Sequence, residues 1–441
     1  MSLAGSRFGI LAYNSISRQA TSPAGMLALT FRELHRCSRP KEDIRSWARA
    51  YTSASASRTA TAEAISAPQV VPAAERKNTV RFKPPPLCHG EEPVATPRKR
   101  PSIISIYAQL AKPRLTALIV LSAMSSYAIA PGGPELGLLE GLSALGCLTI
   151  GTALTSASAN ALNMAREPEF DGMMARTRRR PIVRGLVTRE QAVMFAIVSG
   201  LVGAAVLYFG VNETVSILAV FNIALYAGLY TSMKRTSIVN TWVGAVVGAI
   251  PPLMGWVAVE GAEGLLEPGA WCLAGLLYAW QFPHFNALSY NMRDEYRNAG
   301  YRMAAWTNPA LNARVALRYS VAMIPLCLGM TYFGVTDRVF VIDSSIMNAW
   351  LIWCAVPFWV ACRTMPSASA VASGTATLVS KAAATAASTS ARQLFFASIL
   401  QLPAVLVLAM VHKSGQWAGV WTALESLRGG PGRSVVTGEA D

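Results

Sequence analysis

Long apolar runs separated by short polar loops constrain this chain more than any other feature. From Ile104 onward, each run has about the 17 to 25 residues that a helix needs to cross a bilayer. A spanning strand needs only about 10 alternating residues, so the runs favour helices. Only 14% of the chain is charged, against about 25% in soluble proteins, which excludes a soluble enzyme. We predict an all-α integral membrane bundle of nine transmembrane helices, at about residues 114–130, 138–162, 190–209, 214–232, 239–258, 269–289, 315–333, 346–362 and 393–411.

The loops between these runs alternate in charge, which predicts their orientation. By the positive-inside rule, the loops rich in Lys and Arg lie on one side, which we interpret as the mitochondrial matrix, together with the N-terminus. The opposite loops are mainly acidic, and nine spans place the C-terminus with them. The basic set is Lys112, Arg176, Arg178, Arg179, Arg180, Arg184, Lys234, Arg235, Arg293, Arg297, Arg302, Arg363, Lys381 and Arg392. The acidic set is Glu135, Glu213, Glu260, Glu263, Glu267, Asp337 and Asp343, with Arg338 as the one basic residue among them.

The N-terminal segment differs in composition from the rest. Residues 1–65 are rich in Arg and Ser and poor in acids, which indicates a mitochondrial transit peptide; a chloroplast transit peptide and a disordered basic tail are the alternatives. Much of the net charge of +15 lies in the first hundred residues, so we predict no nucleic-acid partner. We interpret 66–103 as a flexible, Pro-rich basic linker, 104–412 as the membrane domain with a flexible Ala/Ser/Thr-rich insertion at 366–391, and 413–441 as a C-terminal tail.

A first polar cluster follows the second predicted span. Asn163, Glu167 and Asp171 have the spacing i, i+4 and i+8, which on one helix places three oxygen ligands within about an 80° sector. Such a set suits Mg²⁺, which completes its coordination shell with water and substrate phosphate, and the arginines of 176–180 could bind the remaining phosphate charge. Pro168 would kink or break this helix. The alternative is a polar helix end whose arginines serve only topology.

A second cluster lies in and after the sixth predicted span. His284 follows Pro283, which would open the backbone locally, and its imidazole could ligate iron or shuttle a proton. The alternative is a buried histidine bonded to a neighbouring helix. Asp294 and Glu295 either meet the first cluster across the bundle or pair with nearby arginines.

A Lys-Arg pair, Lys234-Arg235, lies in the fourth loop on the same side of the membrane. It could bind phosphate or a carboxylate, or it could serve only as a topology determinant.

Residues about 104–412 resemble the UbiA superfamily of membrane prenyltransferases, and within it the mitochondrial protohaem IX farnesyltransferases (haem O synthases). Five stretches in the same order carry the resemblance, and together they are specific. They are Ala111–Thr116, Asn163–Asp171 running into Arg176–Gly185, Tyr230–Pro252, Trp280–Leu288 and Arg392–Phe396.

The resemblance implies a nine-helix UbiA-like bundle that uses Mg²⁺ to transfer the farnesyl group of farnesyl diphosphate to a vinyl of haem B, giving haem O, with haem A synthase or oxidase assembly factors as further partners in the inner membrane. It assigns Asn163, Glu167 and Asp171 to the metal and to catalysis. Further candidates are Arg176, Arg178, Lys234 and Arg235 for diphosphate, Asp294 and Glu295 for catalysis, and His284 and Arg293 for haem.

Two departures from the wider superfamily matter. Glu167 stands where many members have Asp, and it can still ligate Mg²⁺. The second cluster lacks the two Asp separated by three residues that quinone-type members carry, which favours the haem branch. A prenyltransferase for an aromatic or quinone precursor remains the alternative, and a membrane transporter or a non-catalytic assembly factor is the rival from another class.

Overall fold

The computed structural model describes residues 101–131, 137–364 and 377–417, without the side chains of 377–381. In these ranges the chain is helical apart from loops and one isolated bridge between Thr336 and Lys413. The elements are α4 (Ile103–Leu110), α5 (Pro113–Ile129), α6 (Leu138–Arg166), α7 (Pro168–Met173), α8 (Arg189–Gly210), α9 (Glu213–Ile223), the π-helix η2 (Ala224–Tyr230), α10 (Thr231–Met233), α11 (Asn240–Glu260), the 3₁₀-helix η3 (Gly261–Leu265), α12 (Pro268–Asn291), α13 (Arg293–Asn298), α14 (Ala304–Thr307), α15 (Pro309–Tyr332), α16 (Val339–Arg363) and α18 (Thr377–Val411).

The predicted all-α membrane architecture is confirmed. Among the described residues, seven helical segments are long and apolar enough to span a bilayer, and the pair α4 and α5, bent by 54°, raises the number to eight. The 24-residue α12 packs among them and carries polar side chains such as Gln281 and His284. Nine long helices therefore exist in the described ranges, which is consistent with the predicted number.

Large apolar side chains on the outside of the helices fit a lipid environment. Phe209 is 85% exposed and Trp353 is 78% exposed, on α8 and α16 respectively. Soluble monomers seldom expose extended apolar surface, whereas a membrane protein presents it to lipid tails. The interior instead contains Trp256, Phe282 and Phe358, which are fully buried.

Local sequence signals explain several helix ends. Thr188 and Gln191 form a capping box at the start of α8, and the Asn212 side chain accepts from Val215 N at the start of α9. Asn308 caps α15 in the same way, so this helix begins at Pro309 and not near residue 315. The predicted run at 269–289 forms one continuous α12, which Pro283 does not interrupt.

The predicted flexible insertion at 366–391 is wrong for its second half. α18 begins at Thr377, so residues 377–391 are helical. Alanine is the strongest helix former, and the Ala-rich sequence of this segment therefore extends the last span. The rest of the insertion lies outside the described residues, as do the predicted transit peptide, all but the end of the linker, and most of the C-terminal tail.

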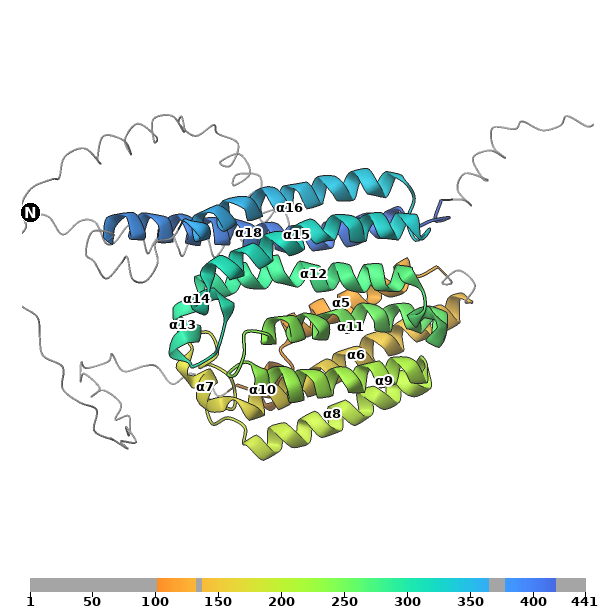
Figure 1. Cartoon of the computed structure of the whole chain (residues 1–441). Coiled ribbons are helices and arrows are strands. Elements are labelled where there is room, and N and C mark those ends of the chain that lie inside the picture. Colours follow the sequence, from red (N-terminus) through yellow and green to blue (C-terminus); the bar gives the residue numbers. More distant parts are fainter. Residues whose placement is uncertain (1–100, 132–136, 365–376, 418–441) are drawn as a thin grey trace, which may run out of the picture. The chain divides into compact units, whose positions relative to one another are not determined.

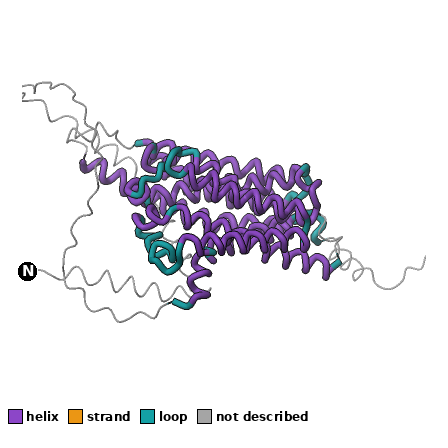
Figure 2. Tube along the Cα trace, turned by 90° about the horizontal axis from the view of Figure 1, so that it is seen from below, coloured by secondary structure: helices purple, strands orange, loops and turns teal. Residues whose placement is uncertain are grey.

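Two neighbouring sets of helices build the bundle (Figure 1). One set is α5, α6, α8, α9 and α11, the other is α12, α15, α16 and α18, and α11 packs against α12 between them. Small residues permit close approach: a Cβ added at Gly255 of α11 would clash with the Ala123 carbonyl oxygen of α5. Figure 2 shows the long helices running in the same general direction, with loops gathered at their ends. The short helices α7, α10, α13 and α14 lie together at one end, where the polar clusters are found.

Candidate active site

The first polar cluster forms where a proline interrupts the chain. α6 ends at Arg166 and α7 begins at Pro168, so Glu167 is the junction, with φ −123° and ψ 31°. The predicted break at Pro168 is confirmed, and one helix does not carry all three side chains, because proline lacks the N–H that a continuous helix would need. The Asp171 N–H nevertheless donates to the Glu167 carbonyl at 2.9 Å. The break turns both carboxylates into the protein.

All three predicted ligands are buried at this junction. Asn163, Glu167 and Asp171 are each 2% exposed or less. The Asn163 amide donates to Glu167 Oε2 at 3.0 Å, so these two side chains converge as predicted. Glu167 Oε1 is buried and has no hydrogen-bond partner in the described part of the chain. Buried carboxylate oxygens are costly without a partner, which marks this atom as available to a cation or a donor group.

Three basic side chains surround the acids. Lys234 Nζ lies 2.8 Å from Glu167 Oε2, and Arg180 is paired with Asp171 Oδ2. Lys112 Nζ donates to Asn163 Oδ1 at 3.2 Å. Lys112 is also the one non-glycine residue with positive φ, 49°, in the described ranges. Strained backbone of this kind clusters at functional sites.

The other predicted phosphate ligands lie outside this cluster. The side chains of Arg176 and Arg178 are exposed. The Arg235 guanidinium lies 4.5 Å from the centre of the Phe170 ring. Of the basic residues selected from the sequence, Lys234 is the one the fold brings to Glu167. Arg180 belongs to the arginine run selected from the sequence, but Arg176 and Arg178 were assigned to diphosphate in its place, and Lys112 was missed as a site residue. The loop after α7 and the break between α4 and α5 determine which basic side chain turns inward.

Burial dominates the protonation of this cluster. Desolvation raises the pKa of the Asp171 carboxyl, and Arg180 opposes that shift through its charge and its hydrogen bond. Desolvation, reinforced by Arg180 and Lys234, lowers the pKa of Lys112 well below its ordinary value. An anion entering the cluster would reverse the shift at Lys112, because it would stabilise the ammonium form.

The segment from α13 to α14 covers the end of the bundle next to these groups. Tyr301 packs against Phe170 and Tyr296, with ring centroids 6.0 Å apart in each pair. The Arg302 N–H donates to the Lys234 carbonyl at 2.8 Å, which ties the cover to the loop that carries Lys234. Buried aromatic side chains thus separate much of the ionic cluster from water at this end.

The second acidic pair has a different role from the first. Glu295 Oε2 accepts from the Ala175 N–H at 3.1 Å, so Glu295 holds the loop after α7. Asp294 is exposed. Arg293 lies over the Tyr290 ring at 4.5 Å and donates to the Tyr290 carbonyl. Glu295 therefore reaches the loop between Asp171 and the arginine run across the bundle, through a backbone N–H and not through the acids themselves.

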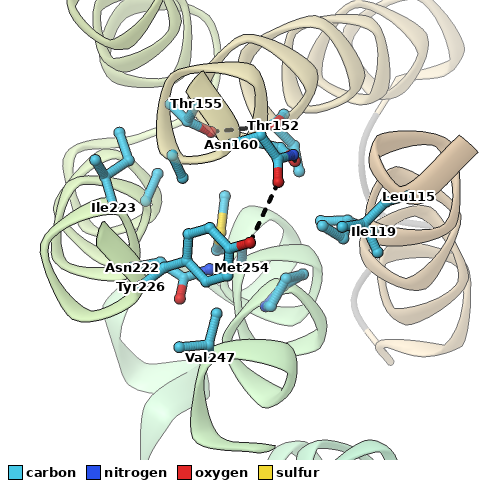
Figure 3. Close-up of a pocket in the computed structure, with 14 residues that line it drawn as sticks. Leu115, Ile119, Thr152, Thr155, Asn160, Asn222, Ile223, Tyr226, Val247 and Met254 are labelled. Atoms are coloured by element: carbon cyan, nitrogen blue, oxygen red, sulfur yellow. Dashed lines mark hydrogen bonds between the residues drawn. The ribbon is translucent and has the colours of Figure 1, made fainter. Parts of the chain in front are cut away.

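A cavity of about 60 Å³ lies on the bundle side of the ionic cluster, between α5, α6, α9, η2 and α11 (Figure 3). Leu115, Ile119 and Met254 form apolar walls, and Asn160 and Tyr226 lie at the wall nearest Asn163. The Tyr226 hydroxyl is 3.5 Å from Asn160 Oδ1. The arrangement joins a charged compartment to an apolar one.

His284 lies on α12 and faces α18. Its Nδ1 is 3.0 Å from Ser398 Oγ, and the Ser398 hydroxyl donates to the Phe395 carbonyl at 2.7 Å. Because that hydroxyl proton is already committed, Ser398 Oγ accepts from His284 Nδ1–H, which leaves the lone pair on Nε2. Trp280 stacks on the imidazole with ring centroids 4.6 Å apart. The predicted alternative of a histidine bonded to a neighbouring helix is therefore present.

The sequence matches the UbiA prenyltransferase family over residues 118–378. The chain belongs to this family. It is 59% identical to the mitochondrial protoheme IX farnesyltransferase of Yarrowia lipolytica over 311 residues, or 70% of this chain and 62% of that protein. It is 53% identical to the protein of the same name from Saccharomyces cerevisiae over 319 residues, or 72% of this chain and 66% of that protein. The matched part thus spans less than two thirds of the length of these relatives.

A solved structure with a similar fold supports the architecture. It comes from work on digeranylgeranylglyceryl phosphate synthase, has a TM-score of 0.53 at 15% sequence identity, and aligns with 70% of this chain and 98% of its own. The resemblance found from five sequence stretches is therefore confirmed at the level of family and fold.

Proposed function

We propose that this protein is a Mg²⁺-dependent prenyltransferase that transfers the farnesyl group of farnesyl diphosphate to a vinyl of haem B, forming haem O. The observation that carries the proposal is the buried cluster of two carboxylates and three basic side chains beside an apolar cavity. Relatives named protoheme IX farnesyltransferase match most of the membrane domain, which supports haem as the acceptor.

The charges of the cluster suit a prenyl diphosphate with one bound Mg²⁺. With Lys112 protonated, three cations face two carboxylates, which leaves one net positive charge. A fully ionised prenyl diphosphate with Mg²⁺ carries one net negative charge. Binding would therefore neutralise a site that is shielded from water, where uncompensated charge is most costly. Lys112, Lys234 and Arg180 then hold the diphosphate as it leaves the allylic carbon.

The residues fit the metal. Mg²⁺ usually takes one or two protein carboxylates and completes its shell with water and phosphate oxygens. Glu167, with its unpartnered Oε1, and Asp171 would be the ligands, with Asn163 beside them. When bound, the metal supplies Lewis-acid stabilisation of the leaving diphosphate.

His284 is the residue we assign to haem. Its Nδ1–H bond to Ser398 fixes the ring orientation and directs Nε2 away from that helix contact, the usual arrangement for an imidazole that ligates a metal. Arg293, at the same end of α12, is available for a haem carboxylate. Glu295 holds the loop after α7 beside the cluster, and Arg176, Arg178 and Arg235 provide positive potential at its edge.

The names of the relatives and the charges of the loops support a location in the mitochondrial inner membrane. The named relatives are mitochondrial, and the predicted transit peptide agrees with them. We place the protein in the inner membrane with the ionic cluster on the matrix side, because the basic loops lie at that end.

Product analysis of the purified protein tests this proposal. The parent is incubated with farnesyl diphosphate and Mg²⁺, and with either haem B or 4-hydroxybenzoate as acceptor, in matched detergent. Formation of hydroxyethylfarnesyl haem, abolished by a Mg²⁺ chelator, is expected. Prenylation of the aromatic acid alone would contradict the haem assignment, and no transfer to either acceptor by folded protein would contradict a transferase.

A further inference from the structure

The span that follows the α8–α9 turn changes its helical geometry beside the ionic cluster. α9 continues as the π-helix η2 from Ala224 to Tyr230, then as α10. Arg166, at the end of α6, donates to the carbonyl oxygens of Ala227 and Gly228 within this segment. π-helical turns are rare and occur frequently at functional sites, because the wider turn redirects side chains.

The π-helix presents two tyrosines to two different surroundings. The rings of Tyr226 and Tyr230 stack, with centroids 5.5 Å apart and planes at 20°. Tyr230 faces the charged side, where Lys234 Nζ lies 4.9 Å from its ring centre. Tyr226 instead lines the apolar cavity (Figure 3).

Tyr226 meets the ionic cluster through its hydroxyl and, at longer range, through its ring, whose centre lies 5.9 Å from Lys112 Nζ. Lys112 Nζ donates to this oxygen at 3.4 Å, and the hydroxyl lies 3.5 Å from Asn163 Oδ1. Its ring therefore forms the boundary between the diphosphate compartment and the cavity. A prenyl diphosphate with its head group at Glu167 and its chain in the bundle must pass this ring at the carbon next to oxygen.

We propose that Tyr226 is a catalytic residue whose ring stabilises the allylic carbocation of the prenyl donor. This inference rests on the proposed function. The C1–O bond of the prenyl diphosphate breaks, its electron pair leaves with the diphosphate oxygen, and the positive charge spreads over the allylic carbons. The electron-rich face of Tyr226 attracts that charge without forming a bond, until the acceptor's double bond supplies the electron pair for the new C–C bond. The positive charge then lies on the acceptor carbon, which takes up water and releases a proton to give the hydroxylated product.

Aromatic character, and not the hydroxyl, is what this role requires. Tyr226→Leu keeps an apolar side chain but removes the π-system, whereas Tyr226→Phe keeps the ring. The single-turnover rate of prenyl transfer isolates the chemical step from product release. We expect Tyr226→Leu to lower this rate by about 30-fold, the factor for a desolvated cation–π contact of ~2 kcal/mol. The single-turnover rate of Tyr226→Phe should stay within about 3-fold of the parent's rate, which is a smaller change than the loss of one hydrogen bond to a charged group would cause.

The affinity for farnesyl diphosphate separates this role from a structural one. Isothermal titration in the presence of Mg²⁺ should give nearly equal dissociation constants for parent, Tyr226→Phe and Tyr226→Leu. Tyr208→Leu, the same change on the lipid-facing side of α8, is the matched control and should leave rate and affinity unchanged. A Tyr226→Leu rate equal to the parent's, or a loss in Tyr226→Phe as large as in Tyr226→Leu, would overturn the inference.

A fluorinated phenylalanine series keeps the test decisive if the leucine variant misfolds. Phenylalanine with one, two or three ring fluorines at position 226 changes size little and weakens the π-system stepwise. A stepwise fall in the single-turnover rate is expected, and a constant rate across the series would overturn the proposal. An inactive parent would instead count against the proposed function, so the two failures are distinguishable.

Discussion

Removing the ammonium of Lys234 tests the energetics of the buried cluster. Lys234 pairs with Glu167 at 2.8 Å, and the two side chains are 13% and 3% exposed. In Lys234→Met the length and apolar stem are retained, so the cost is electrostatic. Leaving one partner of a buried pair alone costs about 3 to 5 kcal/mol, and we take ~3 because Lys234 is not fully buried.

Thermal unfolding in detergent, without diphosphate or Mg²⁺, measures this cost. At about 2 to 4 °C per kcal/mol, Lys234→Met should unfold ~6 to 12 °C below the parent. The double variant Lys234→Met/Glu167→Gln should recover most of the loss, because removing both partners of a buried pair is often nearly neutral. Arg189→Met, an exposed change on α8, is the control. If the losses in unfolding temperature of Lys234→Met and of Glu167→Gln simply add in the double variant, the pairing of the two side chains is refuted.

Three further predictions follow from the described contacts. Arg180 opposes the rise in the pKa of Asp171, so Arg180→Gln should raise this pKa further. The acid limb of the pH profile of kcat/KM should then move to higher pH. An acid limb that stays in place would argue against an ionised Asp171 in the reaction. Ser398→Ala should lower the affinity for haem by about 10-fold without changing the affinity for farnesyl diphosphate, because the imidazole of His284 loses its orienting partner. The absorbance of the bound haem measures this affinity. An unchanged affinity for haem would remove His284 from the haem site. Gly255→Ala should destabilise the bundle by roughly 1 to 3 kcal/mol through its clash with α5, whereas Gly146→Ala, which meets open space, should not; equal melting temperatures would contradict the close contact.

The sequence predicted the membrane architecture well because its signal is long and redundant. Each span contains enough apolar residues to be recognised, and caps such as Thr188 mark the ends of several helices. The segment 377–391 was misjudged because small residues without apolar periodicity resemble a linker, although alanine favours the helix that forms.

The acidic residues of the site could be predicted from the sequence, whereas its basic residues could be predicted less well. Asn163 and Glu167 are one helical turn apart, so their convergence follows from local geometry alone. The choice of Arg180 over Arg176 and Arg178 depends on how the loop after α7 folds, and no local pattern encodes it. Tyr226 was missed for a related reason: a π-helix changes which side chains share a face, and spacing rules for α-helices do not anticipate it.

The formation of farnesylated haem by the parent and by two neighbouring variants tests the central claim most directly. Glu167 is buried in the ionic cluster, whereas Glu169, two residues away, is exposed. With farnesyl diphosphate, haem B and Mg²⁺, mass spectrometry of the haem product should show the parent's rate in Glu169→Gln and a fall of at least about 100-fold in Glu167→Gln, as expected when a group that stabilises the departing charge is removed. Parent-like product formation by a folded Glu167→Gln would contradict the account.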